Sequence, residues 1–125
     1  FLIRDGAARG DNFGASISAA NDEWVVGMPL ADSAGKDAGS VQLFSGMNIT
    51  PIATLHGKTT GDNFGSVLNM QGDVNRDGKN DLAIGAAKFD VSTTVEKRKS
   101  PGIKTVLLKD AGRVEVLSGV ALEDK

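Results

Sequence analysis

Short runs of alternating apolar and polar residues, bounded by glycine or proline, recur along the chain. The clearest alternation lies in "SVQLFSG" (40–46), "PIATLHG" (51–57) and "RVEVLSG" (113–119). Two further runs, "EWVVGMP" (23–29) and "DLAIGAA" (81–87), are short and almost continuously apolar. A period of two in segments of this length predicts β-strands, and no segment shows the period of an amphipathic helix. The pattern therefore predicts an all-β protein.

The same strands occur twice, because the sequence contains an internal repeat. "GDNFG" stands at 10–14 and 61–65, and "AGSVQLFSG" (38–46) returns as "AGRVEVLSG" (111–119). Between these anchors, "VVGMP" (25–29) corresponds to "AIGAA" (83–87). The copies share these anchors but differ in loop length, since the second copy carries two insertions. We interpret each copy as four short strands, A to D, in one antiparallel meander.

Four-stranded antiparallel meanders that repeat in this way are typical of β-propeller blades. We expect residues 1–125 to form a single propeller segment with two blades, at 9–57 and 58–125. Residues 1–8 are predicted to be the closing strand of a preceding blade. The second blade is predicted to contain a projecting hairpin, inserted at 88–110 with a turn at "SPG" (100–102).

The anchors carry a resemblance to a known family. Phe13-Gly14 followed by Gly27-Met28-Pro29, and Phe64-Gly65 followed by Gly85-Ala86-Ala87, resemble the FG-GAP repeats of integrin α-subunit β-propellers. The resemblance covers nearly the whole chain, although "GMP" and "GAA" both depart from the Gly-Ala-Pro of the family. It implies two FG-GAP repeats of an incomplete propeller, in a protein that is extracellular or on the cell surface.

The first insertion of the second copy carries the strongest chemical signal. In "GDVNRDGKNDLAIG" (72–85), oxygen-bearing side chains occupy alternate positions and a ninth position of one loop: Asp73, Asn75, Asp77 and Asp81. Gly78 permits the sharp turn that lets them converge on a hard cation, and Lys79 stands where a backbone carbonyl commonly serves as a ligand. Oxygen-only ligands favour Ca²⁺ over Mg²⁺ or Zn²⁺.

This loop is not an EF-hand, because its twelfth position is Ile84 and its flanks are strands rather than helices. It resembles the calcium loops between the first two strands of integrin-type blades. We expect one Ca²⁺ per chain, and none at the corresponding "ANDEW" (20–24) of the first copy. The alternative is an Asx-rich turn that binds no metal.

The loops at the other end of the blades are the candidate recognition face for a protein or glycan ligand. In a meander the inserted hairpin, the loop 30–38 and the GDN segments lie opposite the calcium loop. They contain Arg9 and Asp11, which with Gly10 spell an adhesion tripeptide, and the basic run Lys97, Arg98 and Lys99. Thr60 replaces Arg9 in the second copy, so the tripeptide is better explained as part of the repeat. The hairpin is equally a tolerated surface insertion, and the basic run a solvated loop tip.

Composition excludes several kinds of function. The formal net charge of −2 gives no basis for nucleic-acid binding, and no apolar run is long enough for membrane insertion. The N-terminal residues do not have the layout of a signal peptide. The chain has no cysteine and one histidine, His56, so thiolate and multi-histidine sites are excluded and no catalytic constellation is evident.

The sequence thus predicts a non-catalytic, calcium-binding propeller segment, and two settings remain open. The first is an adhesion or ligand-recognition protein similar to integrin α-subunits. The second is an accessory propeller of a secreted enzyme, of the phospholipase D type that is specific for glycosylinositol anchors, or a glycan-binding propeller. Two blades cannot close a ring, so we expect the partners to be the remaining blades of a longer chain or further copies in a homo-oligomeric ring.

Overall fold

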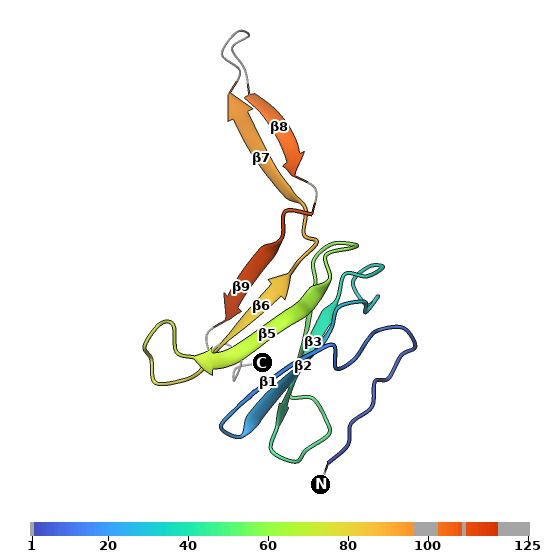
Figure 1. Cartoon of the computed structure of the whole chain (residues 1–125), viewed down its shortest axis with the longest axis vertical. Helices are drawn as coiled ribbons and strands as arrows, with labels where there is room; N and C mark the ends of the chain where they lie inside the picture. The colour runs from blue at the N-terminus through green and yellow to red at the C-terminus, as the bar shows by residue number, and fades with distance from the viewer. Residues whose placement is uncertain (1, 97–102, 109, 118–125) are drawn as a thin grey trace.

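Two packed antiparallel sheets and a projecting hairpin make up the protein (Figure 1). The computed structural model describes residues 2–96, 103–108 and 110–117. Within these ranges the chain forms nine strands and no helix, so the prediction of an all-β fold is confirmed. Because the described residues form no helix, none of them makes a helical segment that could cross a membrane.

The first sheet contains four strands in the order of the sequence. They are β1 (Ser16–Ala20), β2 (Glu23–Met28), β3 (Ser40–Ser45) and β4 (Ala53–His56). Each pairs antiparallel with the next, as predicted for one blade. Trp24 stacks on Phe44 of the neighbouring strand, with ring centroids 4.1 Å apart, and donates its indole N–H to the Gly46 carbonyl. We call this sheet blade 1.

The second sheet, blade 2, contains three strands in the order β5-β6-β9. They are β5 (Phe64–Gly72), β6 (Asp81–Ala86) and β9 (Arg113–Leu117). The β5–β6 ladder is irregular between Phe64 and Val67 and again between Asn69 and Gly72, whereas β6 and β9 pair in continuous register. The predicted first three strands of the second copy are therefore all present.

The predicted insertion hairpin is also present. Strands β7 (Val91–Glu96) and β8 (Ile103–Leu108) pair antiparallel with each other and with no other described strand. Figure 1 shows this hairpin extending away from both sheets. The turn predicted at 100–102 and the basic run Lys97–Lys99 lie outside the described residues.

The closing strand predicted at residues 1–8 stays a prediction, because it would belong to a preceding blade. The described residues 2–8 have no strand assignment and belong to none of the ladders. A β-strand is held by hydrogen bonds to a neighbouring strand, and the closing strand of a blade would need the C strand of that blade beside it. Here the segment instead lies against blade 1, where the Arg4 guanidinium sits 5.8 Å from the centroid of the Phe13 ring.

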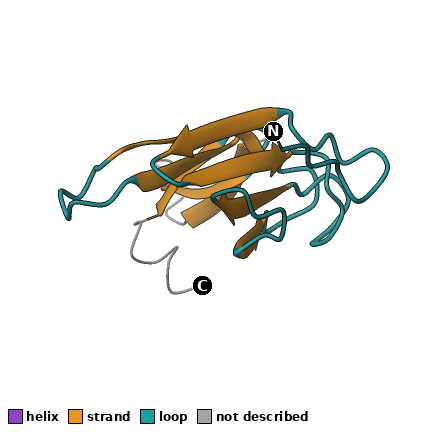
Figure 2. Cartoon of the chain, turned by 90° about the horizontal axis from the view of Figure 1, so that it is seen from below, coloured by secondary structure: helices purple, strands orange, loops and turns teal. Residues whose placement is uncertain are grey.

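A buried apolar cluster lies between the two sheets. Val25, Val41 and Leu43 of blade 1 form one cluster with residues of blade 2, among them Phe64 and Ile84, and all are nearly inaccessible to solvent. Figure 2 shows the strands of the sheets as stacked layers. Packing of one sheet face on another is how neighbouring propeller blades bury their apolar side chains.

Glycine permits this close approach. A Cβ at Gly27 or Gly39 of blade 1 would overlap backbone atoms of Phe64 or Gly65 of blade 2. Ser16 also donates its hydroxyl to the Gly65 carbonyl at 2.5 Å. The Phe64-Gly65 pair of blade 2 therefore lies against three segments of blade 1, at Ser16, Gly27 and Gly39.

Candidate metal centre

The loop between β5 and β6 forms the candidate site. It leaves the sheet at Gly72 and returns at Asp81, which are partners in the β5–β6 ladder. In Figure 1 it protrudes from the end of blade 2 that lies away from the hairpin. Arg76 and Gly78 adopt left-handed backbone conformations, with φ of 60° and 85°, which fold the loop back on itself.

Asp73 organises the centre of the loop. Its two carboxylate oxygens accept hydrogen bonds from the backbone N–H groups of Asp77, at 3.1 Å, and Gly78, at 2.9 Å. These bonds span four and five residues, so the carboxylate lies on the inside of the turn. The first ligand position of the predicted site is thereby fixed by the loop backbone itself.

Asp81 and Asp77 approach from the two sides of the turn. Asp81 accepts from Val74 N–H at 2.7 Å and Asn75 N–H at 3.3 Å, and it is only 3% exposed at the start of β6. Asp77 accepts from the backbone N–H of Lys79 at 2.9 Å and from the Asn75 side-chain amide at 3.2 Å. The backbone of Lys79 thus lies within the same turn.

The structure brings the three predicted carboxylates together. One oxygen each from Asp73, Asp77 and Asp81 lie within 4.8 Å of one another. Oxygens on a single Ca²⁺ stand about 2.4 Å from the ion and so at most about 5 Å apart. An ionised carboxylate has about four acceptor sites, so one oxygen can accept a backbone N–H and still face a cation. The chemistry and spacing of this donor set therefore fit Ca²⁺.

In blade 1 the corresponding connection is much shorter. Ala20 and Glu23 are directly paired, so only Asn21 and Asp22 join β1 to β2. Asn21 takes the positive φ, 55°, that such a tight turn requires. A connection of this length offers no room for a ninth-position acid, which is why the repeat places candidate ligands only in its second copy.

The predicted recognition residues that the structure describes lie at the opposite end. Arg9 is exposed, whereas Asp11 is half-buried and its backbone carbonyl accepts a hydrogen bond from Leu30 N–H at 3.3 Å. Leu30 follows the end of β2, and the hairpin departs from the matching end of β6. Arg9 and Asp11 therefore share one end of the blades with the hairpin.

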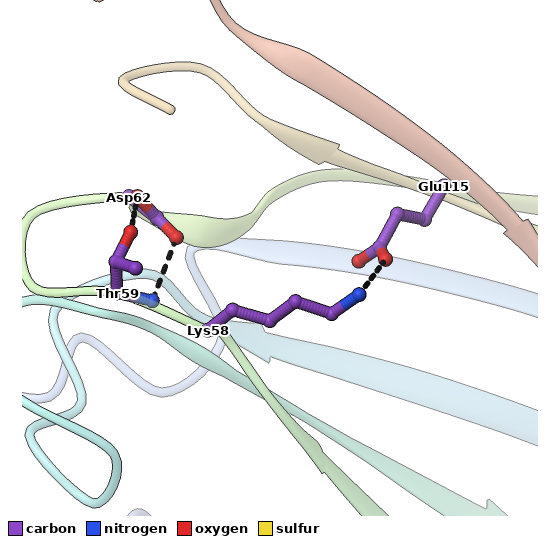
Figure 3. A network of polar contacts seen from close by, with 4 residues as sticks. All are labelled: Lys58, Thr59, Asp62 and Glu115. Carbon is purple, nitrogen blue, oxygen red and sulfur yellow. Dashed lines mark hydrogen bonds and ion pairs between the residues drawn. The ribbon is translucent and has the colours of Figure 1, made fainter. Parts of the chain in front are cut away.

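Sequence reasoning missed two polar pairs, each formed by residues that pattern alone does not associate. The Ser40 hydroxyl lies 2.8 Å from His56 Nδ1, and Ser40 is 1% exposed, so its oxygen is closed to a substrate. Asp62 is 2% exposed and accepts hydrogen bonds from the N–H and hydroxyl of Thr59 (Figure 3). Next to this turn, the exposed Lys58 and the half-buried Glu115 form an ion pair at 3.4 Å (Figure 3).

Two antiparallel sheets that pack face to face, with the Phe64-Gly65 pair between them, have the architecture of neighbouring β-propeller blades. A comparison with family models supports this class, since residues 2–44 match the model described as "FG-GAP repeat". The prediction of an FG-GAP repeat is thereby confirmed, and the matched residues include the first GDNFG anchor and strands β1 and β2.

Proposed function

We propose that this chain is a non-catalytic, calcium-stabilised propeller segment of an extracellular protein that recognises a ligand, as in adhesion proteins of the integrin α type. The convergence of Asp73, Asp77 and Asp81 within 4.8 Å is the observation that carries the calcium part of the proposal. The FG-GAP repeat at residues 2–44 supports the propeller and the extracellular setting.

The role of calcium follows from electrostatics. Three carboxylates this close repel one another, and the backbone N–H groups that face them offset only part of that repulsion. A bound divalent cation would neutralise the cluster and hold the loop in its turn. The side chains of Asp73, Asn75, Asp77 and Asp81, with the backbone carbonyl of Lys79, would supply the ligands.

Ligand recognition is assigned to the other end of the blades. The β7–β8 hairpin extends beyond both sheets, and loops placed on a rigid scaffold commonly carry binding residues (Figure 1). Arg9 and Asp11 lie at that same end, and Lys97, Arg98 and Lys99 belong to the connection between β7 and β8. These residues would contact an acidic or mixed-charge surface on a protein or glycan.

Isothermal titration of the full chain with CaCl₂ tests the metal site. We expect one Ca²⁺ to bind per chain, and an Asp77→Asn variant to weaken binding by about tenfold or more, because the loop loses one of its charged ligands. Asp22→Asn is the matched control, since it removes an exposed carboxylate from the equivalent turn of blade 1. Absence of heat in the wild type, or equal binding by Asp77→Asn, would refute the calcium site.

A glycan and matrix-protein array tests the recognition face separately. The wild type is compared with Arg9→Ala and with a variant in which Lys97, Arg98 and Lys99 are all replaced by alanine. Loss of a signal in either variant, with calcium uptake unchanged, would support the assignment. A signal that is insensitive to both variants would place recognition elsewhere.

A further inference from the structure

The connection between β3 and β4, residues 46–52, contains a tripeptide that the proposed function does not use. It reads Asn48-Ile49-Thr50, which is the Asn-x-Ser/Thr pattern of N-linked glycosylation with a residue other than proline in the middle. None of the other asparagines of the chain has a serine or threonine two residues later. Because so short a pattern also occurs by chance, its structural context decides whether it can act as an acceptor.

The tripeptide lies at the tip of an anchored loop. All three of its residues are exposed. The base of the connection is fixed on both sides, since Gly46 N–H donates to the Asp22 carbonyl at 2.6 Å and Ile52 N–H donates to the Leu43 carbonyl at 2.7 Å. The loop therefore presents the tripeptide to solvent in the folded chain, where a modifying enzyme can reach it.

The Asn48 side chain is held in an Asx turn. Its Oδ1 accepts a hydrogen bond from the Thr50 backbone N–H at 2.9 Å. None of the described residues accepts a hydrogen bond from Asn48 Nδ2, so the nitrogen that would carry a glycan is open to reaction. A hydrogen bond to the amide oxygen also polarises the amide and makes the Nδ2 proton easier to remove.

Apolar side chains stand on both sides of the acceptor. Met47 is 65% exposed and Ile49 is 50% exposed. Carbohydrate on an Asn-x-Ser/Thr site is bulky and solubilising. A glycan at Asn48 would cover these two side chains, which the chain itself leaves in solvent.

The tripeptide also lies at the end of the blades that is opposite the candidate recognition face. The β2–β3 register pairs Glu23 with Ser45, so the β3–β4 connection and the β1–β2 turn share one end of blade 1. The candidate metal loop is at this end too, because Glu23 and Gly78 line the same polar hollow. The hairpin extends from the other end (Figure 1). A glycan at Asn48 would therefore leave the recognition residues uncovered.

We propose that Asn48 is a site of N-linked glycosylation, an inference that rests on the extracellular setting proposed above. In the transfer, a bond forms between Asn48 Nδ2 and the anomeric carbon of an oligosaccharide. The bond from that carbon to the pyrophosphate of a lipid-linked donor breaks, and the lipid pyrophosphate leaves with the bonding electrons. The amide proton passes to a base of the transferase. The Thr50 hydroxyl, which the pattern requires, is the group by which the transferase selects the acceptor.

Expression of the full chain behind a cleavable signal peptide in cultured eukaryotic cells tests the site. The signal peptide delivers the chain to the secretory pathway wherever it normally resides. We expect the secreted wild type to carry an oligosaccharide, seen as a loss of mass when peptide-N-glycosidase is added. In water enriched in heavy oxygen this enzyme converts the modified Asn48 to labelled aspartate, so peptide mass spectrometry locates the site.

Four variants separate the acceptor from its surroundings. Asn48→Gln displaces the acceptor nitrogen, and Thr50→Ala removes the hydroxyl but keeps the N–H that forms the Asx turn, so both should be secreted without the oligosaccharide. Thr50→Ser retains a hydroxyl and should be modified. Thr54→Ala is the matched control, because Thr54 is an exposed threonine in β4 outside the tripeptide, and it should be modified like the wild type. Circular dichroism checks that each variant folds.

Pro51 calls for a fifth variant, since a proline restricts the residue before it to extended conformations. Pro51→Ala frees Thr50 and should be modified at least as fully as the wild type. An unmodified wild type would overturn the proposal, even if Pro51→Ala were modified, and so would modification that persists in Asn48→Gln. The calcium titration and the binding array do not depend on the glycan. A wild type that is modified but binds no calcium would refute the calcium site alone.

Discussion

Glycine sets the distance between the blades at the scale of single residues. Gly27 and Gly85 occupy equivalent positions of the repeat, yet only Gly27 abuts backbone atoms of another blade. Gly27→Ala should therefore destabilise the chain by about 1–3 kcal/mol, because the added methyl group must push rigid backbone apart. Urea unfolding at low protein concentration measures this, with Gly85→Ala as the matched control. Equal destabilisation by the two variants would show that blade contact is not the cause.

The buried carboxylate of Asp62 is also expected to contribute to the stability of the chain. It accepts two hydrogen bonds from Thr59 across the turn that enters β5 (Figure 3). Asp62→Ala should cost about 1–3 kcal/mol in the free energy of unfolding, because the Thr59 groups lose their acceptor. Asp11→Ala should cost less, since Ala8 stands where a hydroxyl donor would be needed in the first copy. The same urea titration compares the two, and a larger loss for Asp11→Ala would contradict this expectation.

Among the secondary-structure elements, the strands that could be predicted are those with a partner inside the chain. Alternation located β3, β4 and β9, and the repeat then assigned their order. Residues 2–8 have no strand assignment, because a strand depends on its neighbour as well as on its own pattern. The candidate metal loop could be predicted because its candidate ligands lie within nine consecutive positions. The Ser40–His56 pair could not, because it depends on the β3–β4 register, which places these residues opposite each other.

At the scale of the secondary-structure elements, we expect the β7–β8 hairpin to be dispensable for folding. Asp90 and Asp110 flank the hairpin, and the Asp110 N–H donates to the Asp90 carboxylate. The Asp37 N–H donates to the Asp32 carboxylate in the same way in blade 1. Replacing residues 91–109 with Ser-Ala-Gly-Lys, the residues at 33–36, should leave the fold intact and change stability by no more than about 1 kcal/mol. Two-dimensional NMR spectra and thermal unfolding check this. Collapse of the blade 2 signals would mean that the hairpin is required for the sheet.

Across the whole molecule, the shared core predicts that the two blades unfold together. The apolar cluster between the sheets draws side chains from both of them, so neither blade keeps this shared buried surface if the other opens. Trp24, the one tryptophan, lies in blade 1, whereas the candidate calcium ligands lie in blade 2. Trp24 fluorescence therefore reports on one blade, whereas the proposed calcium site lies in the other.

We accordingly expect calcium to raise the midpoint of the Trp24 thermal transition. At about 100 times its dissociation constant, a ligand of the native state adds about 2.7 kcal/mol of stability, because it binds the folded chain and not the unfolded one. In a domain of this size that corresponds to roughly 10 °C. Asp77→Asn should lose the shift, while Asp22→Asn should keep it. If circular dichroism showed a calcium-dependent transition that Trp24 fluorescence did not follow, the blades would be independent units, and the core between them would be too weak to couple their unfolding.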